Sequence, residues 1–288
     1  MSGRPLPTVG ADAWLVNLHP RPYAGMRLYC FPCSGAGAST YLGWVRRVAS
    51  FIDLYAINLP GREHRAAEAP LVDLDAVVDH LSEAIHAQED SRPFAFFGHS
   101  MGALLAFETA RRLRKQRRPT PCLLAVSSVA APQLEFMAQQ TAQLLAKDPA
   151  RLLRNFCAVQ PEVLADPNVA SAALPPLLAD LVLLLRHHYV PEAPLDIPLA
   201  ICGSDKDPMV PLDRLSAWKD QTVCESSLHL YPGGHFYLNE LLPELLSDLN
   251  AEFATAYHAV GEPGVQAVDA DGPPASPPAP AFALPDRV

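Results

Sequence analysis

The chain has 288 residues, of which 49% are hydrophobic and 18% charged, so a globular domain with a sizeable core is expected. Its 22 basic and 31 acidic residues give a net charge of −9, which repels a phosphate backbone and argues against nucleic acid as a partner. No apolar run reaches the roughly 18 residues of a membrane-spanning helix, and the first residues contain no signal-peptide block, so we expect a cytoplasmic protein without a membrane partner.

Short strand-like runs alternate with longer amphipathic runs along the chain. This pattern predicts an α/β fold with a mostly parallel sheet flanked by helices. Helices are expected after Ser39, which we interpret as an N-cap, from residue 74, and from the end of a glycine-rich turn at Ser100 to about residue 115. Strands are expected at residues 26–32, from 52, up to 98, from 122, from 198 and from 228.

Residues 134–192 differ from the rest of the chain in composition and pattern: they are leucine-rich, helical in pattern and broken by prolines. Nearly sixty residues exceed an ordinary connection between two strands. We therefore expect a helical cap, or lid, inserted over one end of the sheet. The hydrolase-like domain would span residues 1–260, and residues 261–288, rich in Pro, Ala and Gly, are predicted to be a disordered tail.

The sharpest chemical signal is the sequence Gly98-His99-Ser100-Met101-Gly102 between an expected strand and an expected helix. A G-x-S-x-G sequence in this context is a nucleophile elbow, in which a tight turn projects the serine hydroxyl away from the sheet. The glycines allow two backbones to pass closely, and the helix N-terminus directs amides at a developing oxyanion. Ser100 is therefore the candidate nucleophile.

A serine needs a general base, and in this fold the acid and the histidine follow the nucleophile in that order. His235 lies in a glycine-rich loop after the last expected strand, whereas His229 lies within that strand and His258 at the end of the final helix. Both Asp205 and Asp207 follow the preceding strand. We favour Asp207, because the proline after it stiffens its loop.

The segments CFPCSGAGAS, LPGREHR, RPFAFFGHSMGALLAFETARRL, GSDKDP and YPGGHFYL occur in this order between about residues 26 and 255. Together they resemble the type II thioesterases of nonribosomal peptide and polyketide synthesis, which have the α/β-hydrolase fold. The resemblance implies a hydrolase that removes acyl groups from the phosphopantetheine arms of carrier domains, and we expect it to be a monomer. It also matches Ser100, Asp207 and His235 to the family's catalytic triad.

The loop after the first of these strands departs from the family's usual Phe-Pro-Tyr-Ala-Gly-Gly, because this chain has Phe-Pro-Cys-Ser-Gly-Ala at 31–36. The backbone amides of Ser34 and Met101 are the expected oxyanion donors, and a backbone donor survives a change of side chain. Arg62 and Arg65, in the loop after the second strand, are candidates for docking the carrier, since carriers of this family are typically acidic.

Other signals are weaker. Cys30 and Cys33 form a C-x-x-C, but no second such pair exists and a strand would point them to opposite sides, so we expect reduced thiols and no metal or cofactor. The basic run at 111–118 would lie about 20 Å from Ser100, at the C-terminal end of its helix, where cations complement the helix dipole. A carboxylesterase, an acyltransferase or a non-catalytic binding module on the same fold stay open as alternatives.

Overall fold

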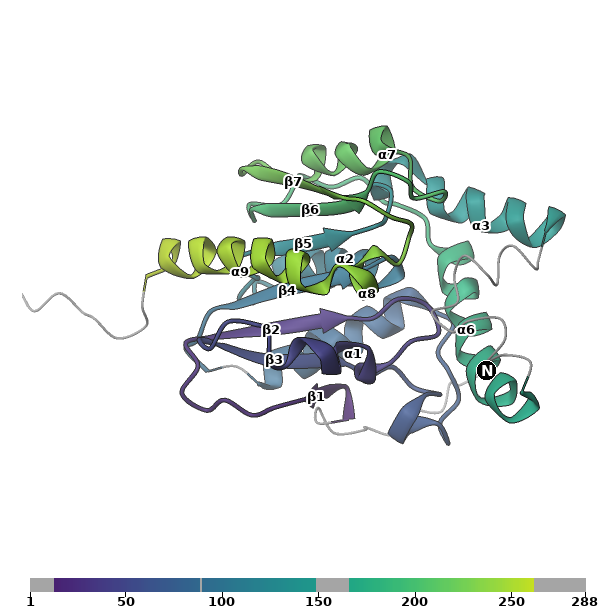
Figure 1. Ribbon diagram of the computed structural model, residues 1–288, viewed down its shortest axis with the longest axis horizontal. Coiled ribbons are helices and arrows are strands. Elements are labelled where there is room, and N and C mark those ends of the chain that lie inside the picture. The colour runs from purple at the N-terminus through teal and green to yellow at the C-terminus, as the bar shows by residue number, and fades with distance from the viewer. Residues whose placement is uncertain (1–12, 89, 149–165, 262–288) are drawn as a thin grey trace, which may run out of the picture.

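The computed structural model describes residues 13–88, 90–148 and 166–261 (Figure 1). In this part of the chain a seven-stranded sheet has the order β1-β3-β2-β4-β5-β6-β7. All neighbouring strands are parallel except β1, which pairs antiparallel with β3. The strands are β1 (Leu15–Asn17), β2 (Met26–Phe31), β3 (Ile52–Ile57), β4 (Phe94–His99), β5 (Leu124–Ser127), β6 (Leu199–Ser204) and β7 (Ser226–Tyr231).

Helices cover both faces of the sheet, so its central strands read as apolar runs rather than alternating ones. All six residues of β2 are buried. Successive side chains enter opposite layers: Phe96 packs with α1 (Leu74–Ala87) and α2 (Met101–Lys115), whereas Phe97 packs with the 3₁₀ helix η2 (Ala38–Trp44) and with α9 (Leu242–Ala259). The expected mostly parallel sheet flanked by helices is confirmed.

The described parts of the expected lid contain two helices, α3 (Phe136–Lys147) and α6 (Pro167–Arg186), which lie beyond the carboxyl ends of the strands (Figure 1). Asp166 caps α6 by accepting from the Asn168 amide at 2.8 Å, and Pro167 occupies its first turn. By length and composition α6 could cross a membrane. Seven of its residues are buried against the rest of the protein, and a single helix of this kind is weak evidence for a membrane span.

One local expectation is wrong. The helix expected after Ser39 is the 3₁₀ helix η2, whose N-cap is Gly37 and not Ser39. The carboxylate of Glu63 accepts from the Ala38 and Ser39 amides at 3.1 and 2.9 Å, so a residue distant in the sequence satisfies the free amides at this helix start.

From residue 262 onward, the predicted tail lies outside the residues that the structure describes. The remaining short elements are η3 (Glu63–Arg65), η4 (Pro132–Leu134), α7 (Leu212–Ser216), η5 (Ala217–Gln221) and α8 (Tyr237–Glu240).

Candidate active site

Ser100 lies at the turn between β4 and α2, with φ 54° and ψ −121°. A positive φ is costly for a residue with a side chain, and such strain is typical of functional sites. Close backbone packing fixes the turn. A Cβ on Gly102 would lie 2.0 Å from the Phe31 carbonyl oxygen, and one on Gly98 would lie 2.4 Å from the Gly102 carbonyl oxygen, so only glycine fits at both positions.

The structure brings Ser100, His235 and Asp207 together from three loops at the carboxyl edge of the sheet. His235 Nε2 lies 3.1 Å from Ser100 Oγ, and His235 Nδ1 lies 2.8 Å from Asp207 Oδ2. In the tautomer that donates Nδ1–H to Asp207, Nε2 accepts from the serine hydroxyl. Asp207 is itself held in place, because its Oδ1 accepts from the Met209 amide at 2.8 Å. This is the geometry of a nucleophile, a base and an orienting acid.

Asp205, the other acid that the sequence left open, does not reach the histidine. It is exposed, and its Oδ1 accepts from the Gly233 amide at 3.3 Å. The other late histidines are also outside the site: His229 lies 2.8 Å from the Glu252 carboxylate, and His258 is exposed. Asp207 is therefore the acid that the geometry favours.

A second polar chain lies behind the histidine. His99 Nδ1 lies 2.9 Å from Ser127 Oγ, which lies 2.9 Å from the Tyr237 hydroxyl. The His99 ring lies 5.1 Å from the ring of His235. Burial, together with the neighbouring His235, holds the pKa of His99 well below its usual value, so a neutral imidazole packs against the candidate base.

The loop after β2 lies against the start of α2, as the tight contact at Gly102 shows. Ser34 in this loop is 1% exposed, and Gly35 follows with φ 75°. Met101 is the first residue of α2 and is fully buried. The two backbone amides expected to bind an oxyanion thus belong to two backbone segments that pack against each other at Gly102.

A cleft of about 700 Å³ opens between this loop and the first half of α6. It is lined by Ser34, Gly35 and Thr40 from the loop side and by Ala172, Pro175 and Pro176 from the lid. None of the three triad residues lines this cleft, and none lines a further cavity of about 580 Å³ near Arg27 and Pro121. In the described ranges no group of three or more His, Cys, Asp or Glu side chains could hold a metal ion, and Cys30, Cys122, Cys202 and Cys224 are free thiols.

The docking role expected for Arg62 and Arg65 is wrong, because both side chains are buried, with 5% and 3% exposure. Arg62 forms a bidentate pair with Asp180 of α6 at 2.7 and 2.8 Å. Arg65 pairs with Glu68 at 2.7 Å and lies over the Trp14 ring, 4.4 Å from its centroid. Guanidinium groups engaged in this way cannot offer charge to an acidic partner.

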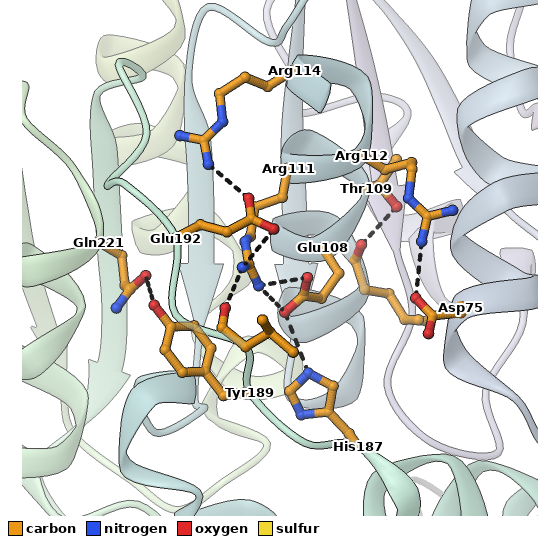
Figure 2. A network of polar contacts seen from close by, with 12 residues as sticks. Asp75, Glu108, Thr109, Arg111, Arg112, Arg114, His187, Tyr189, Glu192 and Gln221 are labelled. Carbon is orange, nitrogen blue, oxygen red and sulfur yellow. Dashed lines mark hydrogen bonds and ion pairs between the residues drawn. The ribbon is translucent and has the colours of Figure 1, made fainter. Parts of the chain in front are cut away.

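In the basic run at the end of α2, Arg111, Arg112 and Arg114 also pair with carboxylates (Figure 2). Arg111 Nη1 lies 2.9 Å from the Glu108 carboxylate, and Glu108 in turn lies 3.3 Å from His187, just after α6. Arg114 pairs with Glu192 at 3.0 Å. These contacts tie the C-terminal end of the lid to α2, which supports a structural interpretation of this run.

Asp180 is not among the residues predicted from the sequence. A single carboxylate in the apolar segment LPPLLADLVLLLR of α6 was the available signal, since a charge at a buried helix position requires a partner. Its partner could not be identified from spacing, because Arg62 lies 118 residues away.

Comparison with known proteins agrees with this geometry. The thioesterase domain family matches residues 26–253. Gramicidin S biosynthesis protein GrsT of Aneurinibacillus migulanus is 37% identical over 235 residues, 82% of this chain and 91% of that protein. Thioesterase PikA5 of Streptomyces venezuelae is 32% identical over 252 residues, 87% of this chain and 88% of that protein.

Among solved structures, the type II thioesterase BorB from the borrelidin biosynthetic cluster superposes with a TM-score of 0.71. It is 30% identical and covers 84% of this chain and 97% of its own. The parallel sheet, the elbow and the lid are thus those of an α/β-hydrolase fold. The chain belongs to the thioesterase domain family and is a thioester hydrolase.

Proposed function

We propose that the protein removes acyl groups from the phosphopantetheine arms of carrier domains, as an editing enzyme of nonribosomal peptide or polyketide synthesis. The hydrogen-bonded series Ser100–His235–Asp207 under a helical lid is the observation that supports this most strongly. Similarity to GrsT, PikA5 and BorB supports the carrier as the source of the thioester. The free thiols of Cys30, Cys122, Cys202 and Cys224 suit a reducing compartment, so we place the protein in the cytoplasm. We further propose that it acts as a monomer.

In the proposed reaction, the Ser100 hydroxyl attacks the thioester carbonyl carbon while His235 Nε2 takes its proton. Asp207 holds the imidazole in the required tautomer and stabilises the imidazolium. The amides of Met101 and Ser34 bind the oxyanion of the tetrahedral intermediate. When this intermediate collapses, the C–S bond breaks and His235 returns the proton to the departing pantetheine sulfur, leaving an acyl ester on Ser100.

Water then completes the cycle. His235 removes a proton from the water as it attacks the acyl ester, and returns that proton to Ser100 Oγ when the second intermediate collapses. The products are a free carboxylic acid and a carrier with a free thiol. Every proton transfer uses His235, and the chain's own residues suffice for each step.

The test compares kcat/KM for one acyl group presented on a carrier domain, on a short pantetheine mimic and as an ethyl ester. We expect the carrier substrate to exceed the mimic by at least about tenfold, about 1.4 kcal/mol of transition-state binding, because remote contacts with the carrier contribute to that binding. The ethyl ester should be the poorest substrate. Equal values for all three would favour a general carboxylesterase, and transfer to an added alcohol or amine instead of water would favour an acyltransferase.

A further inference from the structure

The Asp180 carboxylate is fully buried in the middle of α6 and has three donors. Its Oδ1 accepts from Arg62 at 2.8 Å, and its Oδ2 accepts from both Arg62 and the Gly35 amide, each at 2.7 Å. The same guanidinium donates to the Ala36 carbonyl at 3.0 Å. One ion pair thus joins the lid helix to the backbone of two consecutive residues, Gly35 and Ala36, in the loop that follows β2.

Stability alone does not account for such a pair. Removing two charges from water costs about as much as their attraction returns, and an apolar pair of similar volume is often as stable or more stable. The pair does, however, fix geometry, since a carboxylate with three directed donors has one arrangement. The pair therefore acts by positioning the groups that it contacts.

The loop is fixed from its other side by the residue next to Arg62. The Glu63 carboxylate accepts from the Ala38 and Ser39 amides, and Glu63 itself has φ 49°. Arg62 and Glu63 thus fix the backbone on both sides of Gly37. Arg62 does so directly at the Ala36 carbonyl and, through Asp180, at the Gly35 amide, whereas Glu63 binds the two amides that follow Gly37. The Ser34 amide immediately precedes the peptide unit that Asp180 binds.

We propose that Asp180 is a positioning residue, which through Arg62 and the Gly35 amide sets the orientation of the Ser34 amide and so couples the oxyanion hole to the lid. This rests on the proposed function, in which the Ser34 amide binds the oxyanion. The C-terminal end of α6 is tied separately to α2 through His187 and Glu108 (Figure 2). When α6 lies against the loop the hole is formed, and displacement of Asp180 from the loop removes the acceptor that orients Gly35.

The test replaces the pair by apolar residues of similar volume, in the double variant Arg62→Met/Asp180→Leu, because a single substitution would leave an uncompensated buried charge. We expect kcat on an acyl-carrier substrate to fall about 10- to 100-fold, less than the complete loss of an oxyanion donor. KM should change little, since the contact matters chiefly in the transition state. An unchanged melting temperature or circular dichroism spectrum verifies folding, and Asp180→Asn provides a second variant if the double variant does not fold.

A transition-state analogue distinguishes a misplaced oxyanion hole from a general disruption of the active site. An alkyl trifluoromethyl ketone forms a hemiketal with the serine, whose oxyanion occupies the hole, so its inhibition constant should rise by the same factor as kcat/KM falls. The matched control is Glu108→Gln, which alters the other attachment of the lid and should leave kcat and the inhibition constant at their wild-type values.

Three results would overturn the proposal: a folded variant with wild-type kcat, a fall in kcat without a rise in the inhibition constant, or an equal loss in Glu108→Gln. The proposed function fails in a different way. If the ketone and a fluorophosphonate probe both leave the wild-type enzyme unmodified, Ser100 is not the nucleophile, whatever the variants do.

Discussion

Asp205 and Asp207 are two residues apart in one loop, yet only Asp207 has its carboxylate 2.8 Å from the imidazole of His235. We expect Asp207→Asn to lower kcat by about 10³-fold or more, because the amide stabilises the wrong tautomer of the imidazole. Asp205→Asn should retain most activity, since that side chain is exposed. Steady-state kinetics of both variants on one acyl-carrier substrate makes the comparison, and the reverse ranking would move the acid to Asp205.

His99 predicts a pH dependence of stability. The pKa of His99 in the folded protein is well below 6.5, the ordinary value expected in the unfolded chain. At a pH between the folded and the unfolded pKa, the unfolded chain therefore binds more protons than the folded protein. Its contribution to stability is therefore complete above about pH 6.5 and is lost as the pH falls through the folded pKa, by at most about 1.4 kcal/mol per pH unit.

Urea unfolding of the wild type and of His99→Gln at pH 7.5 and 5.5 measures this contribution. The free energy of unfolding should fall more steeply with acid in the wild type than in the variant, because the variant lacks the buried imidazole. Parallel losses in the two proteins would show that His99 does not determine the acid sensitivity.

At the scale of elements, the contact between the loop after β2 and the start of α2 constrains the elbow most tightly. A methyl group on Gly102 would meet the Phe31 and Pro32 carbonyl oxygens at 2.0 and 2.6 Å, so one backbone segment must move. We expect Gly102→Ala to destabilise the protein by about 1–3 kcal/mol and to abolish most activity. Thermal unfolding checks this, with Gly234→Ala as the stability control, because its added Cβ would meet no atom within 4 Å. Equal melting temperatures for the two variants would contradict the argument.

Most of the central sheet and the elbow could be predicted from the sequence, because their signals are local. Apolar runs mark the buried strands, and Gly98, Ser100 and Gly102 mark the turn between β4 and α2. The antiparallel edge strand β1 was missed, since three residues give too short a pattern to identify.

Long-range pairing explains the errors. The start of η2 depends on Glu63, and the burial of Arg62 depends on Asp180, each far away in the sequence. The position of Arg62 in a loop at the active-site edge was predicted correctly in outline, but the direction of its side chain depends on a lid helix that no local pattern relates to it. A charged side chain in a loop therefore indicates a docking partner only when its burial is known.

At the scale of the whole molecule, the parallel sheet places the candidate catalytic residues at one edge. The loops after β2, β4, β6 and β7 contribute Ser34, Ser100, Asp207 and His235, respectively, and the lid helices lie over the same edge (Figure 1). Ligands of open α/β sheets bind outside the carboxyl ends of the strands, so this arrangement follows from the topology. The lid helix α6 is attached at two places, through Asp180 to the loop and through His187 to α2.

The central claim is that Ser100 hydrolyses acyl thioesters on carrier domains, and intact-mass measurement on a panel of acylated carriers tests it most directly. Each carrier is incubated with the wild type and, in parallel, with Ser100→Ala, whose small side chain preserves the fold. We predict that the wild type converts acylated carriers to the mass of the free-thiol carrier, whereas Ser100→Ala leaves them acylated at an unchanged melting temperature. Deacylation by Ser100→Ala at a rate within a few-fold of the wild type, or a wild type that leaves every acylated carrier intact, would contradict the account.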